Sequence, residues 1–453
     1  MASDLRSIFK AYDIRGIHPD QLDEDAATRI GRAFAEWSGA ERLILGRDCR
    51  LSSPSLSAAF ADGATAGGVG IADIGLATTD MVYFASGRLE LPGVMFTASH
   101  NPPSYNGIKL CRERAAPISE DTGLREIRDL ADSYASGLPS PAPARGAVAE
   151  VDFLDRYLEH LLSFADLERF APLTVAADAA NGMAGLVVPR LFERLPAKLV
   201  PLYMELDGTF PNHPADPIQP ENQADLRTAV TEHGADLGLA FDGDADRVFL
   251  VDEHAGDVSG SLVTALVAKG MLERYPGSKV VHNLICSWTV PEVIRENGGE
   301  PVRTRVGHSF IKQVMAETGA VFGGEHSGHY YFRDHYRADS GLVAAMVVMD
   351  QMSKAGRPLS ELLEPFRRYA ASGEINSEVS DQAGTIEDLA RVFADGRQDR
   401  LDGLTVEYDD WWCNVRASNT EPLLRLNVEA RSQDLLEEKT AAVLAVIRGE
   451  PDA

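Results

Sequence analysis

The chain has 453 residues, of which 44% are hydrophobic and 25% are charged. These proportions exclude disorder as a description of the whole chain, and at roughly 150 residues per domain the length indicates about three domains. The 43 Lys and Arg residues face 69 Asp and Glu residues, which gives a formal net charge of −26. Such a surface excludes non-specific binding to nucleic acid or to an anionic membrane, but it is compatible with a basic pocket for a small anionic substrate.

The four cysteines, Cys49, Cys111, Cys286 and Cys413, lie far apart in the chain. No pair has the spacing of a metal or redox motif, and four are too few for a disulfide scaffold, so a reduced compartment is expected. The first residues lack the apolar region of a signal peptide, and the longest apolar stretches, such as 342–349, are shorter than the ~20 residues that span a bilayer. We therefore expect a cytoplasmic protein with no membrane partner.

Short apolar runs that end in polar residues alternate with segments of helical spacing. The runs lie at 43–45, 94–96, 173–177, 237–241 and 280–281, and the helical segments include 26–37, 153–164 and 224–233. This alternation predicts an α/β architecture with mainly parallel sheets. Ligand-binding groups collect at the carboxyl ends of parallel strands, which is where the polar residues of this chain fall.

Three breaks divide the chain into four predicted domains. A Pro-rich segment at 136–145 has the composition of a spacer, and further breaks are expected near 251–260 and 370–373. The predicted domains are 1–145, 146–252, 253–370 and 371–453. The first three are α/β units of similar size, which indicates a repeated domain, and the last is a smaller α+β domain with two strands and a closing helix.

The segment Thr97-Ala98-Ser99-His100-Asn101-Pro102 directly follows the apolar run at 94–96. A Ser at a strand end beside His is a candidate nucleophile or phosphate carrier, whereas the plain alternative is a turn built by Ser, Asn and Pro. No Gly-x-Ser-x-Gly sequence is present at this place, so a hydrolase triad is poorly supported.

The segment Asp242-Gly243-Asp244-Ala245-Asp246-Arg247 is more specific. Three carboxylates at alternate positions can converge on one hard divalent cation, and Mg²⁺ is favoured if a phosphate completes the shell. A calcium loop is disfavoured, because its sixth position requires Gly and is Arg247 here, and because 248–251 reads as a buried strand. A bare acidic turn is also disfavoured, since charges so close repel unless a cation compensates them.

Two further loops carry polar groups at high density. The loop Gly324-Glu325-His326-Ser327-Gly328-His329 could bind vicinal sugar hydroxyls, and a solvated loop is the alternative. The segment Arg416-Ala417-Ser418-Asn419-Thr420-Glu421-Pro422 could cradle a phosphate through a guanidinium fork, and a turn or helix cap is the alternative. Weaker groups, each with one cation or imidazole beside Gly, lie at 12–16, 106–109 and 307–309.

Together these segments resemble the α-D-phosphohexomutase family, most closely its bacterial phosphomannomutase/phosphoglucomutase branch. The resemblance runs from 9–16 to the Arg416 loop, with the serine loop TASHNP, the metal loop DGDADR, the sugar loop GEHSGH and the phosphate loop RASNTEP in the expected order. It implies four domains around a central cleft, with a fourth domain that holds phosphate. It also implies a hexose-phosphate mutase that needs Mg²⁺ and passes through a hexose 1,6-bisphosphate, which serves as activator as well.

The resemblance assigns expected roles to individual residues. A phosphoryl group is carried by Ser99, next to His100, and Mg²⁺ is held by that group with Asp242, Asp244 and Asp246. The remaining implied site residues are Arg15, Lys109, Arg247, His308 and His329 near the reacting group, Glu325 and Ser327 for sugar hydroxyls, and Arg416, Ser418, Asn419 and Thr420 for the non-reacting phosphate.

Phosphoserine 99 is expected to donate to the free O1 or O6 of a hexose monophosphate, and the bisphosphate must then turn around. The reaction implied is interconversion of the 6- and 1-phosphates of mannose, and also of glucose. The alternatives are a phosphoglucosamine mutase, a non-catalytic phosphosugar-binding relative, and a phosphatase. A monomer or a dimer is expected, with a small phosphosugar as the partner.

Three positions depart from the pattern that the family leads one to expect. In the metal loop, Ala245 stands where Gly is frequent, and Ile285 stands where relatives commonly have Lys. Arg305 is a candidate replacement for that missing cation. In the sugar loop, His326 occupies the variable position, which favours mannose and glucose over glucosamine.

Overall fold

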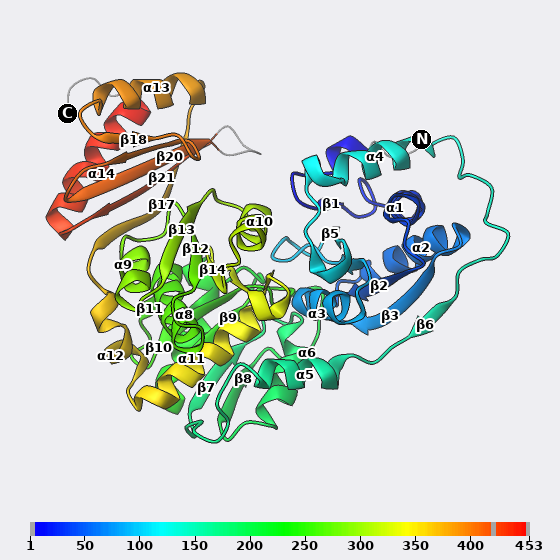
Figure 1. Ribbon diagram of the computed structural model, residues 1–453, viewed down its shortest axis with the longest axis horizontal. Helices are drawn as coiled ribbons and strands as arrows, with labels where there is room; N and C mark the ends of the chain where they lie inside the picture. The colour runs from blue at the N-terminus through cyan, green and yellow to red at the C-terminus, as the bar shows by residue number, and fades with distance from the viewer. Residues whose placement is uncertain (1–4, 418–422, 450–453) are drawn as a thin grey trace.

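The structure is a computed structural model that describes residues 5–417 and 423–449, apart from the side chain of His308. Its strands form four separate sheets, of six, five, five and five strands. Figure 1 shows the corresponding four units in an arc, with the first unit (blue to cyan) facing the third across the middle of the molecule and the fourth (orange to red) next to the third. The predicted fold class, three similar α/β domains and a smaller α+β domain, is confirmed.

The first sheet has the strand order β1-β5-β4-β2-β3-β6, in which β4, β2, β3 and β6 are parallel and β5 runs antiparallel to both β1 and β4. Its elements are β1 (Ile14–Ile17), α1 (Glu24–Ser38), β2 (Arg42–Arg47), α2 (Ser53–Ala66), β3 (Gly70–Leu76), α3 (Thr79–Leu89), β4 (Gly93–Phe96), β5 (Tyr105–Cys111), α4 (Leu124–Ser133) and β6 (Val148–Glu150). The Pro-rich segment 136–145 connects α4 to β6, so the chain returns to the first sheet before it enters the second.

The second and third sheets repeat one topology. Their orders are β11-β10-β9-β7-β8 and β16-β15-β14-β12-β13, each with two antiparallel pairings followed by two parallel ones. The second unit contains α5 (Leu154–Leu162), β7 (Thr174–Asp178), α6 (Ala184–Phe192), β8 (Lys198–Leu202), α7 (Ala224–His233), β9 (Leu237–Phe241), β10 (Val248–Asp252) and β11 (Asp257–Val258). The third contains α8 (Gly260–Arg274), β12 (Lys279–Asn283), α9 (Thr289–Glu296), β13 (Glu300–Thr304), α10 (His308–Thr318), β14 (Phe322–Gly324), β15 (Tyr330–Phe332), β16 (Ala338–Asp339), α11 (Gly341–Ala355) and α12 (Leu359–Leu363).

The fourth sheet is entirely antiparallel, in the order β17-β21-β20-β19-β18. Its elements are β17 (Ala370–Glu378), α13 (Gln382–Val392), β18 (Arg397–Asp399), β19 (Leu404–Glu407), β20 (Trp411–Ala417), β21 (Leu423–Ala430) and α14 (Gln433–Arg448). Alternate residues of β19, β20 and β21 are apolar and pack against α14, which gives this unit a hydrophobic core of its own. By contrast, one continuous core contains residues from the first three units, among them Ile44, Leu239 and Phe332.

The fourth unit joins the third through contacts beside α9 and at the end of β13, where Arg303 pairs with Asp399 and the Val306 N–H donates to Asp402 at 3.1 Å. The buried carboxylate of Glu429 accepts hydrogen bonds from the Trp288 backbone N–H, at 2.8 Å, and from Trp412 Nε1, at 3.0 Å. Ile285 packs against Trp412 in the same place. Across the described ranges, no helix has both the length and the apolar character that a membrane span requires.

Two histidines meet where the first three units come together. The Nε2 atom of His160 on α5 lies 3.0 Å from Nδ1 of the fully buried His335, and the His160 ring stacks on Phe84 of α3 with centroids 4.6 Å apart. Burial lowers the pKa of His160 to about 4 and holds that of His335 well below its ordinary value. Both rings are therefore neutral in the folded protein, and one donates a hydrogen bond to the other.

Acid should weaken this contact between the units. Because the pKa of folded His160 lies below its unfolded value of 6.5, its contribution to stability is complete above pH 6.5 and is lost as the pH falls toward 4, at up to about 1.4 kcal/mol per pH unit. We expect His160→Gln to make the dependence of the free energy of unfolding on pH shallower over this interval, measured by urea denaturation at a series of pH values. The exposed His254 provides the control, since His254→Gln should leave the slope unchanged. Equal slopes in wild type and His160→Gln would contradict the assignment.

Candidate active site

Ser99 lies in the loop between β4 and β5 with its hydroxyl aimed at the second unit. Its φ of +50° places it in the left-handed region, where residues other than Gly are uncommon and where strain accompanies function. The Ser99 N–H donates to Thr97 Oγ1 at 2.9 Å, and the Ser99 hydroxyl donates to Asp242 Oδ2 at 2.7 Å. The side chain is buried, so this loop holds one hydroxyl in a fixed direction against a carboxylate.

The serine loop is anchored by Arg50, which belongs to none of the sequence motifs described above. The side chain of Arg50 is buried and donates to the backbone carbonyls of Ser99, Asn101, Pro102 and Tyr105 at 2.7–3.0 Å. It also forms an ion pair with Asp48 at 3.2 Å. One guanidinium therefore satisfies four carbonyls of a loop that has few hydrogen bonds of its own.

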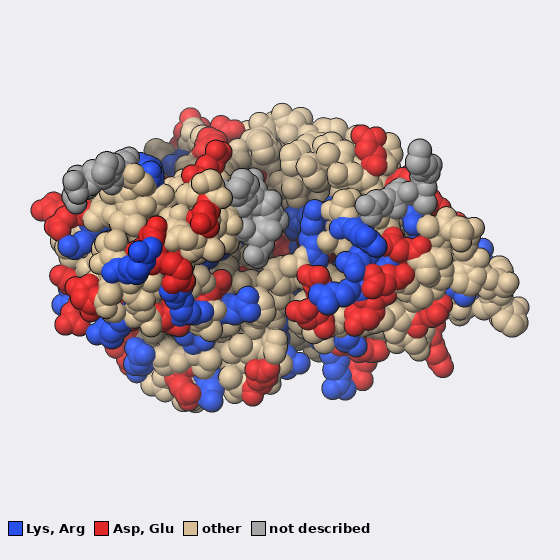
Figure 2. Space-filling view, turned by 90° about the horizontal axis from the view of Figure 1, so that it is seen from above, with Lys and Arg blue, Asp and Glu red and all other residues tan. Residues whose placement is uncertain are grey.

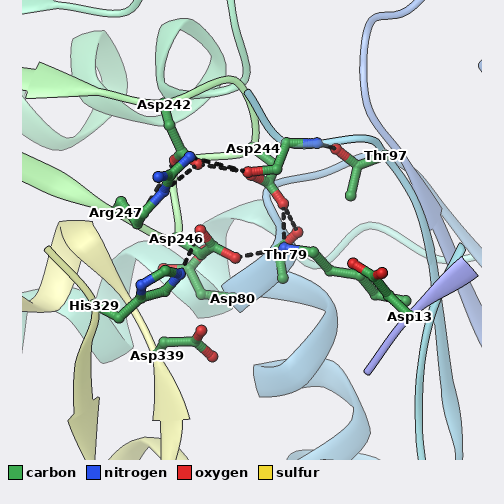
Figure 3. Close-up of polar contacts among 12 residues, drawn as sticks. Asp13, Thr79, Asp80, Thr97, Asp242, Asp244, Asp246, Arg247, His329 and Asp339 are labelled. Carbon is green, nitrogen blue, oxygen red and sulfur yellow. Dashed lines mark hydrogen bonds and ion pairs between the residues drawn. The ribbon is translucent and has the colours of Figure 1, made fainter. Parts of the chain in front are cut away.

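The metal loop follows β9 and turns into β10. The side chains of Asp242, Asp244 and Asp246 are buried, and one ligand atom of each lies within 4.8 Å of the others. Among the described residues, Oδ1 of Asp244 and Oδ1 of Asp246 have no hydrogen-bond partner. Hard carboxylate oxygens gathered in this way fit a divalent cation such as Mg²⁺. Figure 3 shows Asp246 between Asp244 and His329, with Asp339 next to the imidazole.

The backbone of the metal loop also depends on two small residues. A Cβ atom at Gly243 would stand 2.4 Å from the carbonyl oxygen of Ser99, so only Gly lets the two loops approach this closely. The φ of Ala245 is +62°, the left-handed conformation that favours Gly. This conformation gives the physical reason why Gly would suit position 245, and it shows that Ala is accommodated there.

Two cations compensate the buried carboxylates. The Lys109 ammonium on β5 lies 2.7 Å from Asp244 Oδ2 and 2.5 Å from Asp246 Oδ2, and Arg247 Nε lies 3.0 Å from Asp242 Oδ2. Burial raises the pKa of Asp242 well above its ordinary value. Burial also acts to raise the pKa of Asp244 and that of Asp246, but Lys109 contributes to an opposing effect that leaves both lowered.

Contacts from α3 and the serine loop complete the polar shell. Thr79, at the start of α3, donates its hydroxyl to Asp244 Oδ2 at 2.5 Å. Nη2 of Arg247 lies 2.5 Å from His100 Nδ1, and burial, together with the nearby Arg247, lowers the pKa of His100 to about 2. His100 is therefore a neutral acceptor in this contact. Arg15 reaches the same loop and donates to Asn101 Oδ1 at 2.6 Å.

A cavity of about 230 Å³ opens beside these groups, where the first three units meet. It is lined by the predicted residues Arg15, Ser99, His100, Lys109, Asp246, Arg247 and His329, and by Tyr12, Lys312 and Asp339 among those that sequence reasoning missed. Lys312 and Asp339 form a buried ion pair at 2.6 Å. A lone Lys in a helix carries no sequence signal, because its partner lies on a distant strand.

A second cavity of about 670 Å³ adjoins the first through Tyr12, which lines both. Its lining includes Lys10, Arg125, Arg128 and Arg305, and among its acidic residues Glu120 pairs with Arg125 at 3.1 Å. Figure 2 shows Lys and Arg side chains gathered beside the hollow between the two halves of the molecule, although the surface as a whole is acidic. An anionic ligand therefore meets positive charge at the entrance.

Comparison with known families agrees with this geometry. The chain matches the phosphoglucomutase/phosphomannomutase alpha/beta/alpha domain I over residues 6–137, domain II over 155–256, domain III over 259–369 and the C-terminal domain over 374–446. The chain belongs to the phosphoglucomutase/phosphomannomutase family. The resemblance inferred from its four loops is thus confirmed.

Individual members of the phosphoglucomutase/phosphomannomutase family resemble the chain over its whole length. A phosphomannomutase of Salmonella montevideo is 42% identical and is aligned over 97% of this chain and 98% of its own. A phosphohexose mutase of Xanthomonas campestris pv. campestris is 44% identical and is aligned over 97% of this chain and 99% of its own. The crystal structure of a phosphoglucomutase/phosphomannomutase family protein from Burkholderia thailandensis matches with a TM-score of 0.89 at 34% identity, over 100% of this chain and 99% of that chain.

The residues of the sugar loop lie between β14 and β15. The buried Glu325 accepts hydrogen bonds from the Tyr331 hydroxyl at 2.6 Å and the Gly307 N–H at 3.1 Å. His329 has Nδ1 3.1 Å from Ser327 Oγ and Nε2 3.8 Å from Asp246 Oδ1. The sugar loop of this family member therefore contacts the metal loop through His329.

The remaining predicted residues lie farther from Ser99 in the fold or outside the described part of the chain. Arg416 is on β20 of the fourth unit and does not line the cavity beside Ser99. Ser418, Asn419 and Thr420 lie outside the described residues. His308 begins α10, and its side chain is also outside them.

The departure from the family pattern at Ile285 has a local explanation. Ile285 lies in an apolar cluster with Leu284 and Trp412, where an aliphatic side chain packs between the third and fourth units. Arg305 stands 4.2 Å over the ring of Phe310, at the wide cavity. Its replacement of a missing Lys at position 285 stays a prediction.

Removal of the Arg50 fork should loosen the serine loop without unfolding the first unit. In Arg50→Lys the ammonium cannot reproduce the planar donor geometry, so the amides of residues 98–101 and of Ser104 should exchange with deuterium about 10-fold faster or more. Hydrogen exchange resolved by mass spectrometry measures this. Arg47→Lys is the control, because Arg47 ends β2 and, within the described part of the chain, pairs only with Asp73, at 3.5 Å. Exchange of the serine loop should be unchanged in this variant. Unchanged exchange in the Arg50 variant would show that the loop is held by other contacts.

Proposed function

We propose that this chain interconverts mannose 6-phosphate and mannose 1-phosphate, and also the two glucose phosphates, through a phosphoserine at Ser99 and a hexose 1,6-bisphosphate. Family membership and relatives named phosphomannomutase and phosphohexose mutase support hexose-phosphate mutase activity. The observation that carries the proposal is the Ser99 hydroxyl 2.7 Å from Asp242, in a shell of three buried carboxylates flanked by Lys109 and Arg247. Phosphoryl transfer requires such positioning and charge compensation more than covalent chemistry.

We assign the binding of a metal cofactor to Asp242, Asp244 and Asp246, together with the phosphoryl group on Ser99. Their exclusively oxygen ligands favour Mg²⁺, and unpartnered Oδ1 atoms of Asp244 and Asp246 support this choice. When bound, Mg²⁺ neutralises charge on the transferring phosphoryl oxygens.

Proton transfer and charge stabilisation are assigned to side chains of the protein. A sugar hydroxyl oxygen attacks the phosphorus of phosphoserine 99, the bond from phosphorus to Ser99 Oγ breaks, and the hydroxyl proton leaves to a base. Lys109 already bridges two carboxylates, so we assign it to charge stabilisation with Arg247. We assign the proton to His329, which lines the cavity and is held by Ser327. His100 accepts from Arg247 and keeps that guanidinium beside Ser99 Oγ, 3.4 Å from Nη2.

The second half of the cycle runs in the opposite sense. The bisphosphate turns around, and Ser99 Oγ attacks the phosphorus of its other phosphate. The bond from that phosphorus to the sugar oxygen breaks, His329 returns the proton to that oxygen, and the isomeric monophosphate leaves with phosphoserine 99 restored. Glu325 and Ser327 are assigned to sugar hydroxyls, Arg15 and His308 to the region of the reacting group, and Arg416, Ser418, Asn419 and Thr420 to the non-reacting phosphate. We further propose the four domain ranges 1–145, 146–252, 253–370 and 371–453, where β6 and β11, just past the first two bounds, complete the first and second sheets. We also propose a cytoplasmic monomer or dimer with no nucleic-acid or membrane partner.

Phosphorus NMR tests the activity and the role of Ser99 together. Purified protein with Mg²⁺, mannose 1-phosphate and a trace of glucose 1,6-bisphosphate should produce the 6-phosphate signal, and Ser99→Ala should reduce the rate by about 1,000-fold or more, since the group that accepts phosphoryl is lost. Ser104→Ala, in an exposed part of the same loop, is the control and should retain the rate.

Other outcomes of the NMR experiment point to the alternatives. Turnover of glucosamine 1-phosphate alone would indicate a phosphoglucosamine mutase. Binding of hexose phosphate without turnover would indicate a non-catalytic relative. Free phosphate released in proportion to substrate consumed would indicate a phosphatase.

Metal binding can be measured apart from turnover. We expect the chain to bind one Mn²⁺ in place of Mg²⁺, detected as loss of the free-ion signal in electron paramagnetic resonance, and Asp244→Asn to weaken this binding by about 10-fold or more. Asp257→Asn, at an exposed carboxylate at the edge of the same sheet, is the control. Equal Mn²⁺ affinity in wild type and Asp244→Asn would place the cation elsewhere.

A further inference from the structure

The sheet of the fourth unit brings two guanidinium groups and one carboxylate together. Arg416 on β20 and Arg425 on β21 are directly opposite in the antiparallel register. Glu374 on β17 bridges them, with Oε2 2.5 Å from Arg416 Nη2 and Oε1 3.5 Å from Arg425 Nη1. Figure 1 shows these three strands side by side in the fourth unit. Like charges opposite each other destabilise a sheet, so the single carboxylate offsets a repulsion between the two arginines.

The face of the sheet that carries Arg416, Arg425 and Glu374 has more hydrogen-bond donors than acceptors. Among the described residues, Nε of Arg416, Nε of Arg425 and Nδ2 of the buried Asn427 have no hydrogen-bond partner. Two guanidinium groups against one carboxylate also leave one net positive charge. The group of residues is therefore incomplete by itself and fits an additional oxyanion with several acceptor oxygens, such as a phosphate monoester.

The same face is directed toward the sugar loop of the third unit. A cavity of about 250 Å³ between the two units is lined by His326 and Asn427. Burial lowers the pKa of Arg416, against the opposing effects of Glu374 and of Glu325 in the sugar loop. Burial likewise lowers the pKa of His326, while Glu374 acts to raise it. Glu374 thus lies within electrostatic range of both the guanidinium and the sugar loop.

We propose that Glu374 is an internal competitor for the phosphate-binding guanidinium groups, and that Arg425 is a second guanidinium of that phosphate site. The inference rests on the proposed function, in which Arg416 holds the non-reacting phosphate. A dianionic phosphate and the Glu374 carboxylate compete for the same N–H donors of Arg416. The bisphosphate must leave this site once in every cycle in order to turn around, and a carboxylate that takes its place lowers the affinity and makes release easier.

The direct test measures binding of mannose 1-phosphate by calorimetry in a Ser99→Ala background, where no turnover interferes. Adding Glu374→Gln removes a negative charge beside the phosphate and should tighten binding by about 3- to 10-fold. Adding Arg425→Gln should weaken binding by about 10-fold or more, since a charge-assisted partner is lost. Glu378→Gln, an exposed residue on the same strand, is the matched control for a general charge effect and should change affinity little.

Turnover gives a second readout, which a purely structural role of Glu374 would not produce. With Ser99 present, Glu374→Gln should lower KM and kcat together, because a phosphate held more tightly is released more slowly. Weaker binding in Glu374→Gln would show that this carboxylate orients Arg416 instead of competing with phosphate, and unchanged binding would show no competition; either result overturns the proposal.

Three kinds of failure can be told apart: misfolding of a variant, failure of the proposed function, and failure of this inference alone. If Glu374→Gln does not fold, as judged by circular dichroism, Arg425→Gln still decides the second part, because unchanged affinity there removes Arg425 from the phosphate site. If the Ser99→Ala chain binds no mannose 1-phosphate and the wild type shows no turnover, the proposed function itself fails and this inference falls with it. Binding and turnover that are insensitive to position 374 overturn the inference alone.

Discussion

Three carboxylates buried on one turn repel one another unless cations approach them, and this constraint organises the rest of the molecule. The second unit, which contains Asp242, Asp244 and Asp246, supplies Arg247 itself, but Lys109 comes from β5 of the first unit. The imidazole of His329 comes from the third. Compensation of the buried charge therefore requires that the first and second units meet at one place, where a side chain of the third lies as well. The continuous hydrophobic core beneath them keeps that place fixed.

The repeated topology explains how three units can meet in this way. In each sheet the central strand, β4, β9 or β14, pairs with one parallel and one antiparallel neighbour and ends in a loop that carries candidate site residues. The loops that follow them hold Ser99, Asp242 and Glu325 respectively. One arrangement of strands, used three times, thus provides three different loops, and the chemistry differs in the side chains that each loop carries.

Much of this could be predicted from the sequence because the signals are local. The serine, metal and sugar loops each place several functional groups within six residues, directly after an apolar run, and the structure brings Ser99, Asp246 and His329 to one cavity. Arg50, Lys312 and Glu374 could not be found in this way. Each is a single charged residue whose importance depends on a partner far away in the chain, and side chains of this kind usually lie at the surface. The left-handed conformation of Ala245 was likewise visible only in the backbone, although the sequence had marked the position as unusual.

The separate core of the fourth unit has a consequence for how the protein can change over evolutionary time. Its apolar residues pack among themselves and α14, and what joins it to the third unit is mainly polar, with the bond from Trp288 to Glu429 and the Arg303–Asp399 pair among the contacts. Exchange of this unit between relatives by recombination would leave the core of the other three intact, provided that the residues on both sides of these contacts still match. The fourth unit and the three units that share a core are thus encoded in segments of the gene that can be inherited separately without loss of either core.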